Sequence, residues 1–250
     1  MFEPFTILAI AGAFLIGGVV KGVIGLGLPS VSLALLALTI DLPSAMALIV
    51  MPTFFTNVWQ ALVGGNGKVL VVRLWPFFLL AAITVWIGAS ALTHVDLAWL
   101  SALLGVLLMI YSAVNLGGFH FKTSPRHEVW LGPLMGSLNG VFMGMTGSAV
   151  VPGVMYLQSL GLSRDVLVQA MGILFMVTTL ALGIALQQNA FLTVQNGMVS
   201  LAALIPAVIG MLGGQWVRQI LSESLFRRVF FVSLLLLGMY IIFISFSRSI

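Results

Sequence analysis

The sequence predicts an all-α integral membrane protein, and three observations support this fold class. Of the 250 residues, 61% are hydrophobic and 6% are charged, and the mean hydropathy is +1.20. A soluble domain carries about 25% charged residues, so this chain has too few to cover a surface that faces water. The apolar residues form long continuous runs without the alternation of a membrane β-barrel. These observations exclude a soluble enzyme and a nucleic-acid-binding module.

Ten apolar runs follow one another along the chain, separated by polar, Gly or Pro residues. A helix needs about 20 apolar residues to cross the hydrocarbon core, with a range of about 17–25. Four runs are shorter than this, so each short pair is either two spans or one re-entrant hairpin, and the crossings number ten or eight. The short runs are 5–20, 28–40, 129–143 and 148–162, and the others are 43–63, 69–93, 97–117, 164–187, 193–217 and 225–247.

The basic residues predict the orientation of the chain. If exposed segments alternate between two sides, starting with the N-terminus, nine of the ten Lys and Arg residues fall on the second side. Basic residues concentrate in cytoplasmic segments, so both termini are predicted to lie outside the cytoplasm. The predicted location of the protein is the cell (inner) membrane. The nine are Lys21, Lys68, Arg73, Lys122, Arg126, Arg164, Arg218, Arg227 and Arg228, and the tenth is Arg248.

The two halves of the chain resemble each other. The segment 18–29 can be laid over 136–152, which places Asn139 opposite Lys21. Each half has an odd number of crossings, so the second half is expected to be inverted relative to the first, as in many secondary transporters. We therefore expect two inverted-topology repeats of about five hydrophobic helices each. The expected parts are a first transmembrane repeat at 1–117, a polar cytoplasmic linker at 118–127 and a second transmembrane repeat at 128–250.

Each repeat contains a glycine-rich break that is a candidate anion site. Glycine allows backbone N–H groups to face a ligand, and a helix N-terminus just after the break adds a partial positive charge. If both breaks reach the middle of the membrane, two helix N-termini converge on one anion. The alternative is close helix packing, because several of these glycines have G-x-x-x-G spacing.

Lys21 is the only charged residue within either glycine-rich break. A lysine at the bilayer centre costs about 2.5–3.5 kcal/mol on insertion scales, and a bound anion would offset this. The alternative is a lysine that extends to the cytoplasmic surface. The candidate substrate-binding residues are Lys21, Gly22, Gly25, Gly27, Asn57, Asn139, Gly140, Gly144, Gly147 and Ser148.

Polar residues also form a stripe on the run 43–63, where their spacing places them on one helix face. Such a stripe should face the protein interior, where it either lines the pathway or ties helices together. The stripe contains Thr53, Thr56, Asn57 and Gln60, and its counterpart on 164–187 contains Gln169, Thr178 and Thr179.

The sequence offers little for metal or catalytic chemistry. His94 and Asp96 lack further partners nearby, and His120 and His127 lie in the linker, so no metal ion and no cofactor is expected. The chain has no Walker loop and no catalytic dyad or carboxylate cluster within the runs. An enzyme is therefore not expected. The acidic and histidine residues lie at or near the run ends, which leaves no side-chain proton relay.

The repeated order of short helix, G-x-x-G-x-G-type break, short helix and long helix resembles the sulfite exporter TauE/SafE family, also called the four-toluene sulfonate uptake permeases. The segment 139–152 fits this pattern best. The resemblance implies a secondary transporter of a small sulfur-containing anion, sulfite or a sulfonate, acting as an exporter. The alternative is an anion channel of similar architecture. The expected partners are the anion and the lipid bilayer, without nucleic acid, and a homo-oligomer is left open.

Overall fold

The structure is a computed structural model and describes residues 3–119, 121–220 and 222–247. The regular elements of this part of the chain are all helical, which confirms the predicted fold class. Their order is α1 (Pro4–Ile24), α2 (Leu28–Leu36), α3 (Leu42–Leu62), α4 (Gly67–Ile83), α5 (Val85–His94), α6 (Leu97–Leu116), α7 (Pro125–Thr146), η1 (Val150–Val154), α8 (Met155–Ser159), α9 (Arg164–Gln188), α10 (Val194–Ile220) and α11 (Glu223–Ser247). His120 and Arg248 lie outside the described residues.

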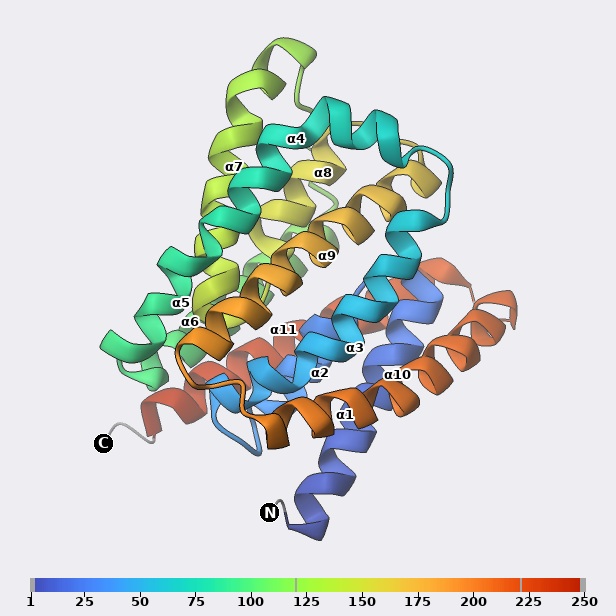
Figure 1. Cartoon of the computed structure of the whole chain (residues 1–250). Coiled ribbons are helices and arrows are strands. Elements are labelled where there is room, and N and C mark those ends of the chain that lie inside the picture. Colours follow the sequence, from blue (N-terminus) through green and yellow to red (C-terminus); the bar gives the residue numbers. More distant parts are fainter. Residues whose placement is uncertain (1–2, 120, 221, 248–250) are drawn as a thin grey trace.

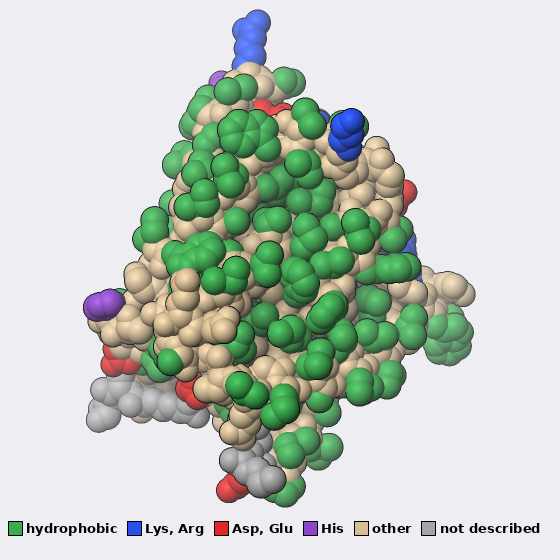
Figure 2. Space-filling view, in the orientation of Figure 1, with side chains coloured by type: hydrophobic (Ala, Val, Ile, Leu, Met, Phe, Trp, Pro, Cys, Tyr) green, Lys and Arg blue, Asp and Glu red, His purple; other side chains and the backbone are tan. Residues whose placement is uncertain are grey.

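Seven of the described helical stretches are long and apolar enough to cross a membrane, counting α4 and α5 together. The others are α1, α3, α6, α9, α10 and α11. Figure 2 shows hydrophobic side chains over the whole visible face, with charged side chains near its edges. Among the described hydrophobic residues, Trp59, Ile205 and Phe243 are each more than 60% exposed. A surface of this kind is stable against lipid and not against water.

The predicted lengths of two short runs, 5–20 and 129–143, are wrong. α1 contains 21 residues and α7 contains 22, so at about 1.5 Å per residue each is as long as a core of about 30 Å is thick. Of the two, only α1 is among the seven stretches that are also apolar enough to cross. α1 continues through Lys21 because that side chain is bonded inside the protein, so it does not end the helix. α7 starts before the predicted run, at Pro125, because proline suits the first helical turn.

The predicted single run 69–93 is also divided, because the helix is interrupted at Thr84. The hydroxyl Oγ1 of Thr84 lies 2.8 Å from the carbonyl oxygens of both Leu80 and Ser137. A threonine that bonds backbone carbonyls in this way competes with regular helix geometry. The interruption thus coincides with a contact to α7.

Two helical hairpins account for the short return helices. α2 has nine residues, and η1 and α8 have five each. The segment before α7 meets the end of α8, since the Thr123 N–H donates to the Ser159 carbonyl at 2.9 Å. In the first hairpin, the Ser32 hydroxyl donates to the Ala13 carbonyl at 3.1 Å. The second hairpin therefore returns to the end that it left, as both a re-entrant hairpin and a pair of spans would do.

The helices pack as two bundles, and each bundle contains a helical segment from the other half of the chain. α1 packs chiefly on α10, and α7 packs chiefly on α4 and α5. Figure 1 shows α3 and α9 side by side in the middle of the view, with α1 and α10 to the lower right, α4 and α7 above and α5 to the left. The first bundle contains α1, α2, α3 and α10, and the second contains α7, η1, α8, α9, α4 and α5. The packed bundles therefore differ from the two halves of the sequence.

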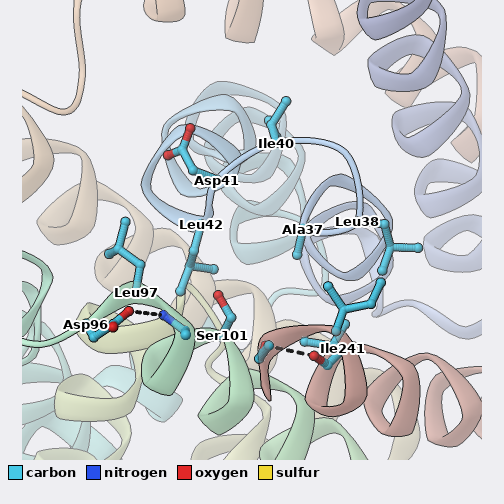
Figure 3. Close-up of a pocket in the computed structure, with 12 residues that line it drawn as sticks. Ala37, Leu38, Ile40, Asp41, Leu42, Asp96, Leu97, Ser101 and Ile241 are labelled. Carbon is cyan, nitrogen blue, oxygen red and sulfur yellow. Dashed lines mark hydrogen bonds between the residues drawn. The ribbon is translucent and has the colours of Figure 1, made fainter. Parts of the chain in front are cut away.

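Segments predicted to share a side of the membrane lie together. Figure 3 shows a cavity where Asp41 and Asp96, both from segments predicted outside, lie near Ile241 of α11. Its volume is about 240 Å³. Another cavity, of about 290 Å³, is lined by Phe121 and Arg227, from segments predicted to be cytoplasmic. The two aspartates cap helices, since each accepts a bond from a backbone N–H at 2.8–2.9 Å. This grouping agrees with the alternation of sides along the chain.

Candidate anion-binding site

Lys21 is a buried cation inside the first bundle. Its side chain extends from α1 to α3, and the residue is 4% exposed. The ammonium Nζ donates to Asn57 Oδ1 at 2.5 Å and to Thr56 Oγ1 at 3.1 Å. The Lys21 side chain therefore does not extend to a surface.

The charge of Lys21 has no acidic partner among the described residues. In that part of the chain, the ion pair that forms is between Arg73 and Glu128. Two neutral oxygens accept two of the three N–H groups of an ammonium, so one donor is left for another acceptor. A buried cation without a counter-charge is strongly unfavourable. A bound anion would supply both the missing charge and the missing acceptor.

The site lies where the central helices of the two bundles cross. A Cβ built on Gly172 of α9 would lie 2.8 Å from the Ala61 nitrogen of α3, and one on Gly183 would lie 3.1 Å from Val50 Cγ1. The helices therefore run antiparallel and in contact between these two points. Asn57 lies between Val50 and Ala61, so Lys21 is held near the middle of the crossing.

The predicted polar stripe divides into two groups with different roles. Thr53, Thr56 and Asn57 of α3, like Thr178 and Thr179 of α9, are at most 4% exposed and lie near the middle of the crossing. In contrast, Gln60 Nε2 donates to the Val168 carbonyl at 2.6 Å, and Gln169 Nε2 donates to the Ala61 carbonyl at 2.8 Å. The glutamines therefore tie α3 to α9, which is one of the two predicted roles, whereas Thr56 and Asn57 bond the Lys21 ammonium.

Three of the candidate glycines pack against neighbouring helices. A Cβ on Gly22 would lie 2.9 Å from the Gly214 Cα of α10, and one on Gly144 would lie 2.8 Å from the Gly88 carbonyl carbon of α5. A Cβ on Gly140 would clash with the Ala81 carbonyl oxygen. The geometry at these positions supports the packing interpretation, in which small residues let helix backbones approach closely.

The two glycine-rich breaks do not converge, contrary to the expectation from the sequence. Gly25 and Gly147 end α1 and α7 in the left-handed conformation, with φ of 87° and 73°. A Cβ on Gly25 would lie 3.2 Å from Val168 near the start of α9, and one on Gly147 would lie 2.9 Å from Met46 near the start of α3. Gln60 of α3 bonds Val168, so the Gly25 contact is level with Gln60, whereas the Gly147 contact is level with Met46. At about 1.5 Å per residue, these two levels are about 20 Å apart along α3.

The remaining candidates belong to the local structure of their hairpins. Gly27 is the N-cap of α2, where a Cβ would lie 2.7 Å from Val20 Cγ1. Asn139 is fully buried, and its Oδ1 accepts from the Gly153 N–H at 3.0 Å. The Asn139 Nδ2 and Ser148 Oγ atoms have no hydrogen-bond partner within the described residues. These two side chains do not bond Lys21.

Thr56 is the direct Lys21 partner that the predicted site set omitted. Its position on the polar stripe, next to Asn57, was the available signal. Residue spacing showed that the two share a helix face, but it could not show that Lys21 of another helix reaches both.

The helical fold and the apolar surface define a multi-pass membrane protein, and the buried cation defines a candidate site for an anion. The family described as sulfite exporter TauE/SafE matches residues 9–241, so the chain belongs to this family of transporters. The match extends from α1 into α11 and confirms the resemblance inferred from the glycine-rich segments. No match was found among curated proteins or solved structures.

Proposed function

We propose that the protein is a secondary transporter that moves a small sulfur-containing oxyanion, sulfite or an organosulfonate, out of the cell. The observation that carries this proposal is the buried Lys21 ammonium, which bonds only neutral oxygens of Thr56 and Asn57 at the α3–α9 crossing. Membership of the sulfite exporter family supports the substrate class.

The proposed architecture is a pair of inverted-topology repeats joined by the linker 118–127, with the site where the repeats meet. Reciprocal contacts support it. Gly22 packs on Gly214 as Gly144 packs on Gly88, and the glycines that end α1 and α7 contact equivalent places on α9 and α3. These contacts favour a register in which Met143, rather than Asn139, corresponds to Lys21.

A counterflow experiment tests the function. Purified protein is reconstituted into liposomes loaded with unlabelled sulfite, and uptake of labelled sulfite is measured against concentration. A carrier gives saturable uptake with a transient overshoot, whereas a channel gives no counterflow. Lys21→Met should abolish the uptake, because it removes the charge while keeping a similar volume. Normal counterflow by Lys21→Met would contradict the proposed site.

We place the protein in the inner membrane of the cell. In the proposed orientation both termini lie outside, and Lys68 and Lys122 lie on the cytoplasmic side. The chain has no native cysteine, so single introduced cysteines can be labelled in intact cells. An impermeant thiol reagent should modify Asp96→Cys and should leave Lys68→Cys and Lys122→Cys unmodified. Strong labelling at position 68 or 122 would reverse the orientation.

The proposed driving force is the membrane potential and the anion gradient rather than a side-chain proton relay. Asp41 and Asp96 are helix caps, and Glu128 lies in the first turn of α7. An interior-negative potential favours anion exit by about 2.3 kcal/mol per charge per 100 mV. Sulfite efflux from liposomes should therefore follow an imposed potential without a pH gradient. Efflux that ignores the potential and is lost in Glu128→Gln would contradict this proposal.

A further inference from the structure

Two threonine hydroxyls at the α3–α9 crossing have no hydrogen-bond partner within the described residues. They are Oγ1 of Thr53 on α3 and Oγ1 of Thr179 on α9. Both residues are fully buried, with 0% exposure. A buried hydroxyl without a partner is unfavourable, so two of them at one crossing require an explanation.

The packing of the two helices brings these hydroxyls to the same place. Thr179 lies between Gly172 and Gly183 at helical spacings that put all three on the face of α9 toward α3. Thr53 lies one turn after Val50, the residue that Gly183 contacts. Thr53 and Thr179 are therefore at the same level of the crossing, on facing sides.

Thr53 is also adjacent to the lysine partners. The Asn57 Nδ2 group donates to the Thr53 carbonyl at 2.8 Å, while Asn57 Oδ1 accepts from Lys21. The Thr53 side chain thus lies one helical turn from the residue that holds the ammonium. A cation and two unpaired hydroxyls are gathered within about one turn of the crossing.

Two neighbouring threonines at the same crossing do have hydrogen-bond partners. Thr178 Oγ1 donates to the Leu174 carbonyl at 2.8 Å, and Thr56 Oγ1 lies 2.7 Å from the Pro52 carbonyl. Threonines in helices commonly satisfy their hydroxyls in this way, on the preceding turn. Thr53 and Thr179 do not, so their hydroxyl protons are available to a ligand.

We infer that Thr53 and Thr179 form the second half of the substrate site, facing the half made by Lys21. The inference rests on the proposed function. The three groups supply one ammonium N–H and two O–H donors, and the hydroxyls come from both bundles. Such a set fits a compact anion with at least two oxygens on one central atom, such as sulfite or a sulfonate head group.

Valine and serine substitutions of the crossing threonines test this inference. Sulfite binding to the purified protein is measured by calorimetry for Thr179→Val, Thr53→Val and the control Thr178→Val. Valine keeps the shape of threonine without the hydroxyl. Thr179→Val and Thr53→Val should bind sulfite about tenfold more weakly, whereas Thr178→Val should bind within about twofold of the parent. Thr179→Ser retains the hydroxyl and should bind like the parent.

The melting temperature without sulfite separates a binding role from a structural one. Loss of an unpaired buried hydroxyl should leave the melting temperature of Thr179→Val unchanged or raised. A lowered melting temperature together with weaker binding would show a structural role and overturn the inference. Unchanged binding by Thr179→Val, with binding lost in Lys21→Met, would also overturn it while leaving the proposed function standing. Unchanged binding by Lys21→Met would overturn both.

Discussion

The two hairpins of the molecule are packed alike and differ in their chemistry. In both, a long helix with a glycine stripe lies against a helix of the other half of the chain and ends at a left-handed glycine. One turn before that glycine, the first hairpin has Lys21 and the second has Met143. Both residues are buried. Close glycine packing is therefore common to both hairpins, whereas only the first has a lysine at the position one turn before the terminal glycine.

The two bundles are also stabilised differently. In the first, Pro52 interrupts the hydrogen bonds of α3, and the Ser200 hydroxyl of α10 donates to the Leu48 carbonyl at 2.7 Å in its place. In the second, Arg73 of α4 holds Glu128 of α7 through two bonds of 2.7 and 2.8 Å. The stabilities of variants at these positions and at the hairpins should therefore distinguish the packing that the two bundles share from the polar contacts that differ between them.

The largest effect is expected at the glycine interfaces. Gly214→Leu and Gly88→Leu should both prevent folding, because each adds a side chain where a Cβ alone would meet the carbonyl carbon of the facing helix at 2.8–2.9 Å. Gly213→Leu is the control, since a Cβ there has nothing within 4 Å. The measurement is the yield of monodisperse protein by gel filtration. Tolerance of only one of the two substitutions would show that the interfaces are not alike.

Met143→Lys is expected to have the next largest effect. It puts a cation into the second bundle at a position where the native side chain is 1% exposed. The protein should lose about 2.5–3.5 kcal/mol of stability, measured as thermal unfolding in detergent. Met143→Leu keeps the volume and should cost less than about 1.5 kcal/mol. A lysine tolerated at position 143 would indicate that the second hairpin can also hold a charge.

Ser200→Ala should destabilise the first bundle by about 1–3 kcal/mol, because it leaves buried backbone groups unpaired. The Ser200 hydroxyl both donates to the Leu48 carbonyl and accepts from the Met51 N–H at 3.0 Å. Ser200→Thr, which keeps the hydroxyl, should be less harmful. Unfolding of the two variants is compared by circular dichroism. Equal losses would assign the effect to packing rather than to the hydroxyl.

Glu128→Gln should have the smallest effect, a loss of about 0.2–1 kcal/mol. It removes the carboxylate that Arg73 holds, at a site where the arginine side chain is 42% exposed. The loss should shrink at high salt, because exposed ion pairs are screened. Thermal unfolding at low and high salt measures this. A larger loss of stability that does not depend on salt would mean that the Arg73–Glu128 ion pair stabilises the fold as much as the Ser200 hydrogen bonds do.

Much of this architecture could be predicted from local sequence. The long apolar runs predicted the helices because a backbone inside a bilayer must satisfy its own hydrogen bonds. The glycine-rich segments led to the correct family. The length of α1 was underestimated, because Lys21 looks like the polar end of a run. The hydrogen-bond partner of Lys21, Asn57, is 36 residues away along the chain, and a local pattern carries no information about that contact.

Hydropathy and glycine spacing were sufficient to predict the membrane environment, the helical class, the family and the small residues that helix packing requires. The tertiary structure alone decided that the glycine breaks lie apart, that α10 and the α4–α5 pair exchange bundles, and that Lys21 reaches the α3–α9 crossing. The physical reason is range. Hydropathy and glycine spacing act over a few helical turns, whereas the depth of a hairpin and the partner of a buried charge depend on which distant helix packs against it.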